Sequence, residues 1–187
     1  MGATLEPCAA EGPVSSGVEA AQPVALAAIY DENVAFVWRS LRALGVPSAV
    51  LDDAVQEVFL VVHRRIAQFE GRSALKTWLF GIAYRVAANV RRAERRRPTE
   101  PLSSELTTEQ PSPEQHAFRA EAARFVEAFL NTLDEDLRVA FTACVLEEMS
   151  VPEAAHALGV NLNTLYSRVR LARAKFSTAL AKRNLKR

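Results

Sequence analysis

The chain has 187 residues, of which 49% are hydrophobic and 24% charged, and its formal net charge is +1. This balance is typical of a soluble protein with one ordinary domain or two small ones, and it excludes collagen-like, mucin-like and fully disordered chains. Glycine and proline are few for an all-β chain of this length, whereas helix-forming residues are abundant, so the composition predicts an all-α fold.

The first half of the chain is predicted to be a flexible leader followed by helices. Residues 1–23 contain three prolines and three glycines without sustained periodicity, which predicts a leader. Apolar residues recur at helical spacing over 24–44, which predicts one or two helices with a break near Asp31. Ser48 is expected to cap a second helix that runs to about Gln68. A third helix is expected from near Ser73 through an arginine run to Pro98, where proline ends it.

The second half is predicted to be a linker and a helix-turn-helix module. Residues 98–115 hold four prolines among Ser, Thr, Glu and Gln, which is typical of a flexible linker. Helices are expected over about 116–132 and from Asp134. Ser150 and Glu153 form the pattern of a capping box, and Gly159 suits the tight turn before a basic final helix. Two small helical domains, 24–97 and 116–187, are therefore expected.

Charges are segregated along the sequence. Residues 1–60 carry two basic and eight acidic residues, and 61–99 carry ten and two. Residues 100–153 carry three and twelve, and 154–187 carry eight and none. Two basic blocks thus alternate with two acidic ones, which favours contact with nucleic acid at two places and with protein between them.

The numbers of cysteines and histidines and the distribution of apolar residues argue against a disulfide-rich, metal-binding, membrane or secreted protein. Cys8 and Cys144, with only three histidines, are too few for a disulfide scaffold or a zinc site, so we expect no metal and no cofactor. No stretch approaches the roughly 20 apolar residues that span a bilayer. The first 38 residues lack lysine and arginine, so a signal peptide is not expected either. We expect a cytoplasmic protein without membrane insertion.

Two helices carry the residue types that bind nucleic acid. The final helix presents polar and basic side chains around its apolar residues, as a helix that enters the major groove does. The third helix is basic and has Phe69, Trp78, Phe80 and Tyr84 nearby, which offers phosphate neutralisation and surfaces for stacking an unpaired base. The alternative for Trp78 and Phe80 is that they belong to the core.

The chain contains two motifs in sequence. The first is the run from Asp53 to Phe59, followed by Phe69, Gly71, Ser73, Thr77-Trp78-Leu79 and Ile82-Ala83. The second comprises Leu133-Asp134, Arg138, Ala155, Leu158-Gly159-Val160, Thr164 to Arg168 and Ala172-Arg173. The first motif resembles region 2, and the second resembles region 4, of the bacterial RNA polymerase sigma factors of the extracytoplasmic-function group. The resemblance covers about residues 24–183, in the family's order.

The resemblance implies a non-enzymatic specificity subunit that binds core RNA polymerase and promoter DNA. Its expected polymerase partners are the clamp helices of the largest subunit and the flap of the second subunit, and an anti-sigma factor is a further expected partner. The residues implied at the clamp helices are Asp53, Gln56, Glu57 and Phe59. Those implied at the minus-10 element, which region 2 recognises and melts, are Phe69, Arg72, Ser73, Lys76, Thr77, Trp78, Arg85, Asn89 and Arg92. Those implied at the minus-35 element are Asn163, Thr164, Tyr166, Ser167, Arg168, Arg170 and Arg173.

The sequence departs from the family pattern at three positions. Many relatives have asparagine at the position of Arg85 and lysine or arginine at that of Tyr166, so the promoter sequence stays open. Ala154 replaces the usual branched apolar residue before Ala155, which would loosen helix packing by about 1–3 kcal/mol if nothing compensates for the missing side chain.

Two other functions are alternatives to this one. A stand-alone helix-turn-helix regulator would need only the second module and would bind DNA without polymerase. A helical enzyme could use Glu147 and Glu148, or Asp134 to Asp136, as carboxylate catalysts. Adjacent acids on a helix point in different directions, and a capped helix start explains Asp134 to Asp136 better.

Overall fold

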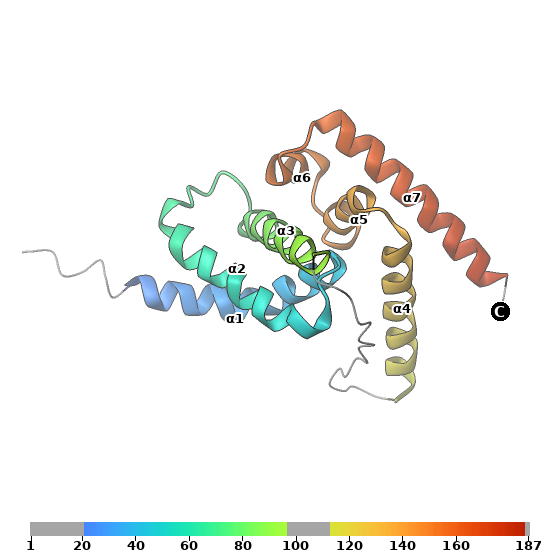
Figure 1. The fold of residues 1–187 in the computed structure, drawn as a ribbon, viewed down its shortest axis with the longest axis horizontal. Helices are drawn as coiled ribbons and strands as arrows, with labels where there is room; N and C mark the ends of the chain where they lie inside the picture. Colours follow the sequence, from blue (N-terminus) through green and yellow to red (C-terminus); the bar gives the residue numbers. More distant parts are fainter. Residues whose placement is uncertain (1–20, 97–112, 186–187) are drawn as a thin grey trace, which may run out of the picture. The chain divides into compact units, whose positions relative to one another are not determined.

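The computed structural model describes residues 21–96 and 113–185 (Figure 1), with side chains from 26–96 and 120–185. These residues form helices and short turns, and no strand occurs among them. The chain divides into two compact units, 1–32 and 33–187. Cys8, the predicted leader up to residue 20 and most of the predicted linker lie outside the described residues.

The first part of the chain forms three long helices. α1 (Ala21–Ala43) is a single helix, without the break considered near Asp31, and it ends before Gly45, whose φ is 86°. α2 (Leu51–Arg65) follows a 3-10 turn, η1 (Ser48–Val50), and leads into a second one, η2 (Ile66–Gln68). α3 (Leu75–Glu94) is the third.

The predicted cap of the second helix is wrong. Ser48 does not cap α2, because the chain first tightens into η1, where the Val50 N–H donates to the Pro47 carbonyl at 3.1 Å. The N-cap of α2 is Val50, which makes no side-chain cap bond. α3 begins at Leu75, two residues after Ser73, near which its start was expected, and ends at Glu94 within the arginine run, before Pro98.

Apolar stripes of α1, α2 and α3 form the core of this part. The stripe of α2 follows the predicted i, i+3, i+4 spacing, so one side of the helix is buried and the other faces solvent. Phe80 lies entirely inside this core, as the alternative reading of that residue expected. The most deeply buried side chains are Val37, Leu41, Leu44, Leu51, Val58, Val62, Leu79, Phe80 and Ala83.

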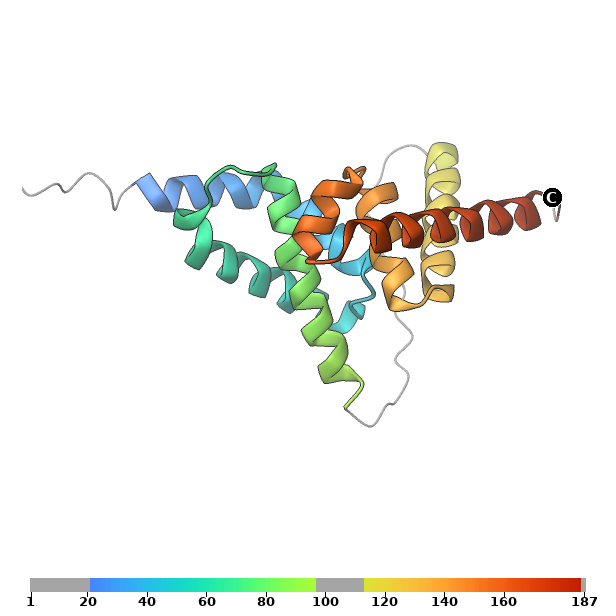
Figure 2. The same ribbon diagram turned by 90° about the horizontal axis from the view of Figure 1, so that it is seen from above.

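The second part contains four helices and a π-helical turn. α4 (Pro113–Thr132) starts three residues before the expected position, and α5 (Glu135–Phe141) begins after the predicted cap Asp134, which accepts from the Leu137 N–H at 2.9 Å. The π-helical turn η3 (Thr142–Leu146) was not predicted. α6 (Val151–Leu158) and the long α7 (Leu162–Asn184) complete the chain (Figure 1, Figure 2).

Phenylalanines from α4, α5 and α7 join these helices. The rings of Phe129, Phe141 and Phe176 lie 5.0–5.2 Å apart between centroids, in tilted or edge-to-face geometry. Leu130, Leu133, Leu137 and Ala172 complete this cluster. Aromatic pairs at such distances contribute about 0.5–1.5 kcal/mol beyond their buried area, so this cluster fixes α7 against α4 and α5.

The capping residues and the glycine turn predicted for the helix-turn-helix fix the ends of α6 and the start of α7. The Ser150 hydroxyl accepts from the Glu153 N–H, and the Glu153 carboxylate accepts from the Ser150 N–H, which is a complete capping box. Gly159 has φ 68°, a left-handed conformation that glycine adopts without strain. Asn161 then caps α7 through the N–H groups of Asn163 and Thr164.

The cap at Ser150 yields a stability prediction. Ser150→Ala removes the side-chain acceptor and should lower the free energy of unfolding by about 1 kcal/mol. Ser48→Ala is the matched control, because Ser48 makes no cap bond with α2, and it should change stability by less than about 0.5 kcal/mol. Urea denaturation of both variants measures the difference. Equal losses would contradict the assignment of the caps.

Candidate nucleic-acid interface

One side of α7 is a continuous polar stripe. Asn163, Tyr166, Ser167 and Arg170 are exposed and follow one another at spacings of three, one and three residues, so they share a side of the helix. Leu165, Val169 and Ala172 occupy the opposite, buried side. The Tyr166 ring is 50% exposed, although it is aromatic. The stripe therefore offers amide, phenol, hydroxyl and guanidinium groups together, which are groups that contact base edges and phosphates.

The other three residues proposed for the minus-35 element lie beside this stripe. Thr164 is exposed. Arg168 forms an ion pair with Asp136 at the start of α5. Arg173 is exposed and lines a pocket behind the helix-turn-helix. Arg168 and Arg173 thus also face other parts of the protein, namely Asp136 and the pocket.

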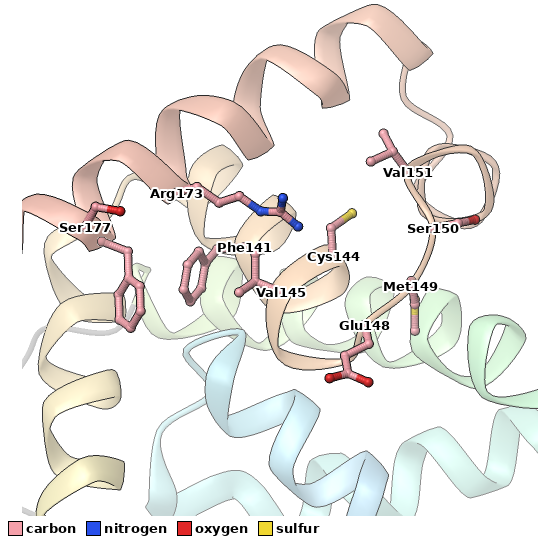
Figure 3. Close-up of a pocket in the computed structure, with 10 residues that line it drawn as sticks. Phe141, Cys144, Val145, Glu148, Met149, Ser150, Val151, Arg173 and Ser177 are labelled. Carbon is pink, nitrogen blue, oxygen red and sulfur yellow. The ribbon is translucent and has the colours of Figure 1, made fainter. Parts of the chain in front are cut away.

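The pocket at Arg173 is an open depression of about 640 Å³. Figure 3 shows the Arg173 side chain extending from α7 toward Cys144 on η3. Burial raises the pKa of the Cys144 thiol, and the positive charge of Arg173 offsets this only in part, so the thiol stays protonated at neutral pH. Within the described residues, no three His, Cys, Asp or Glu side chains cluster as metal ligands.

A second polar stripe runs along α3. Trp78, Arg85, Asn89 and Arg92 are separated by seven, four and three residues, so all four lie on one side of the helix. Arg85, Asn89 and Arg92 are exposed, and Trp78 is half-buried. The Trp78 ring stacks at a tilt on Phe69, with 5.1 Å between ring centroids. We name these four residues the α3 stripe.

The remaining residues proposed for the minus-10 element surround the start of α3. Arg72 is exposed and paired with Glu70, and Ser73 is partly exposed. The Lys76 ammonium lies 5.9 Å from the centre of the Phe36 ring. Thr77 is only 4% exposed, so its side chain belongs to the core in this structure.

The exposed side of α2 carries three of the four residues proposed to bind polymerase. Asp53, Gln56 and Glu57 are exposed on one side, whereas Phe59 is 7% exposed and packs into the core. Leu60 continues the exposed side and is 50% exposed. Sequence reasoning did not single out Leu60, although its spacing of three and four residues from Glu57 and Gln56 places it with them.

Ion pairs between α3 and α5 were also missed. Arg91 precedes Arg92 directly but was not among the residues predicted to bind DNA. Its guanidinium pairs with Glu135 at 2.5 Å, and Arg95 reaches the same carboxylate at 3.2 Å. Burial lowers the pKa of Arg138, as does the nearby charge of Arg91, while Glu135 opposes that effect. Glu135 therefore stands among three arginines.

Comparisons with known proteins identify both parts of the chain. The model of Sigma-70 region 2 matches residues 29–97, and that of Sigma-70, region 4 matches residues 126–176. The RNA polymerase sigma factor NccH of Alcaligenes xylosoxydans xylosoxydans is 32% identical over 148 residues, which cover 76% of this chain and 79% of NccH. The ECF RNA polymerase sigma-E factor of Escherichia coli K12 is 33% identical over 144 residues, with 72% and 75% covered.

Solved structures show the same fold. CnrH, in complex with the cytosolic domain of CnrY, matches with a TM-score of 0.63 and 26% identity over 86% of this chain and 90% of CnrH. The sigma factor RpoE of Bartonella quintana, in complex with the anti-sigma factor NepR, matches with a TM-score of 0.62 and 22% identity over 81% and 94%.

None of the described helices is long and apolar enough to cross a membrane.

The two family models match in the expected order, and the two relatives are more than 30% identical along most of the chain. The chain belongs to the sigma-70 family of RNA polymerase sigma factors, in its extracytoplasmic-function group.

Proposed function

We propose that the polar sides of α2, α3 and α7 are the three binding surfaces of a promoter-specificity subunit. α2 binds core polymerase, α3 binds the minus-10 strand and α7 binds the minus-35 duplex. The observation that carries the proposal is that α3 and α7 each bury one side and present a separate stripe of polar and basic groups on the other. Two separate DNA-binding stripes suit two promoter elements.

The chemistry at the minus-10 element follows from the α3 stripe. Removing a base from the stack costs a few kcal/mol, and stacking on an aromatic side chain returns about 1–3 kcal/mol per base. The Phe69–Trp78 pair offers such a surface, and Arg85 and Arg92 lie along the same side to neutralise phosphates. Melting on this account needs only binding energy, so the chain acts as a binding subunit without catalysis.

The chemistry at the minus-35 element follows from the α7 stripe. The Asn163 amide and the Arg170 guanidinium can form paired hydrogen bonds with base edges or phosphates in the major groove. Tyr166 occupies the middle of the stripe, where a neutral, apolar ring with one hydroxyl replaces the basic residue common in relatives. We infer that Tyr166 reads base shape or a thymine methyl and contributes little to the salt dependence of binding.

An anti-sigma factor is the further partner that we propose. CnrH and RpoE were both solved in complex with a second protein, the cytosolic domain of CnrY and the anti-sigma factor NepR. The stand-alone regulator is not favoured, because residues 29–97 match sigma region 2 and are not an unrelated sensing domain. A polymerase-dependent shift of promoter DNA in the presence of this chain tests the proposal against that alternative.

Arg170 provides the test at the minus-35 element. Arg170→Ala should weaken binding of polymerase holoenzyme to a minus-35 duplex about tenfold, which corresponds to one charged hydrogen bond of about 1.5 kcal/mol. The slope of log affinity against log salt should become shallower by about one unit. Lys182→Ala, an exposed basic residue near the end of α7, is the control and should leave both quantities unchanged. A loss without any change in slope would exclude a phosphate contact for Arg170.

The exposed side of α2 provides the test at the polymerase. Gln56→Ala and Leu60→Ala should each weaken binding of the chain to core polymerase severalfold in a fluorescence titration, because both side chains lie on the side proposed to face the clamp helices. Gln68→Ala removes an exposed glutamine outside α2 and serves as the control. If the control lost as much affinity as the α2 variants, the binding surface would lie elsewhere.

A further inference from the structure

The first two turns of α7 carry no charged side chain. Residues 162–167 read Leu-Asn-Thr-Leu-Tyr-Ser, and the basic residues of the helix begin at Arg168. In a helix-turn-helix, the first turns of the second helix are the part that contacts base edges in the major groove. Their lack of charge therefore favours contact with bases over contact with phosphates at this end of α7.

Two large apolar side chains are exposed in these turns. Leu162 is 40% exposed and Tyr166 is 50% exposed, and their spacing of four residues places them on the same side of the helix. Together with Pro152, Gly159 and Val160, Leu162 also lines a shallow depression beside the turn that precedes α7. We name Leu162 and Tyr166 the apolar pair.

Other residues hold the start of α7 in place. The Asn161 side chain caps the helix, because it accepts from the Asn163 N–H at 2.9 Å and from the Thr164 N–H at 3.4 Å. Leu165 and Val169 are 1% and 5% exposed, and they fix the helix in the core. The apolar pair supplies neither the cap nor the buried contacts, so its surface is open to a partner.

The chemistry of the major groove indicates which base suits the apolar pair. Of the groups that base pairs present there, the C5-methyl group of thymine is the apolar one, and apolar side chains contact it. Guanine and adenine present acceptors, and cytosine and adenine present amino groups. Covering such polar groups with an apolar side chain costs free energy, because they lose hydrogen bonds to water without gaining new ones. Thymine is therefore the base whose edge matches the apolar pair.

We propose that Leu162 and Tyr166 contact thymine methyl groups in the minus-35 duplex and so select thymine at the positions that face the start of α7. The proposal rests on the proposed function of α7 and deepens it, since it adds Leu162 to the residues that face DNA and names the base. Apolar contact releases no counterions, so this selection of thymine does not depend on salt.

Deoxyuridine tests the contact, because it differs from thymidine only by the missing methyl group. Transcription from a genomic fragment library supplies a promoter with its minus-35 duplex, and each thymine of that duplex is replaced in turn by deoxyuridine. At one or two positions the replacement should weaken binding of polymerase holoenzyme about fourfold, the effect of one buried methyl group. A minus-35 duplex without thymine, or equal affinity after every replacement, would overturn the proposal.

Variants of the apolar pair identify the side chain that makes each contact. With Leu162→Ala or Tyr166→Ala, holoenzyme should bind the thymine duplex about three to ten times more weakly. The deoxyuridine replacement at the matching position should then have almost no further effect, because the methyl group has already lost its partner. Arg170→Ala should weaken binding to both duplexes by the same factor. Sensitivity to deoxyuridine that both variants of the apolar pair keep in full would contradict the proposal.

A control variant and the salt dependence complete the test. Leu185→Ala removes a leucine that is 87% exposed at the far end of α7, and it should leave both affinities unchanged. An equal loss with Leu185→Ala would overturn the proposal. Leu162→Ala should keep the salt slope of the unsubstituted chain, and a shallower slope would likewise overturn it. If the proposed function failed, holoenzyme with the unsubstituted chain would not discriminate between minus-35 duplexes even before deoxyuridine was introduced.

Discussion

Each functional helix of this chain must bury one side and leave the opposite side free for a partner, and this constraint organises the rest of the structure. α7 buries Leu165, Val169 and Ala172, so its polar stripe faces away from the core. α2 and α3 obey the same rule within the first part of the chain. A side chain can therefore serve the core or a partner, which is why the buried Phe59 and Thr77 differ from the exposed residues proposed beside them.

The elements that carry strong local signals were predicted well. The capping box at Ser150, the glycine turn at Gly159 and the cap at Asp134 depend on neighbouring residues alone, and the structure confirms all three. The cap of α2 was misplaced, because the 3-10 turn that precedes this helix has no distinctive pattern of residue types. Leu60 and the Arg91–Glu135 pair escaped notice, since exposure and long-range contacts are set by packing between helices that periodicity does not describe.

The alternation of charge along the sequence becomes a spatial arrangement in the folded chain. Carboxylates of residues 100–153 pair with arginines from both basic blocks: Glu135 with Arg91, and Asp136 with Arg168. Partly exposed ion pairs contribute little to folding stability, about 0–1 kcal/mol each. The pairs show how acidic and basic blocks that are separate in the sequence come together in the folded chain.

The central claim is that this chain turns core polymerase into a promoter-specific enzyme. The most direct measurement is transcription by bacterial core polymerase on a genomic fragment library, with and without the purified chain, followed by sequencing of the transcript starts. New starts preceded by a shared pair of spaced motifs are the predicted result, and those motifs would reveal the bases read beside Arg85 and Tyr166. Identical starts with and without the chain, together with tight binding of the chain alone to duplex DNA, would contradict the account.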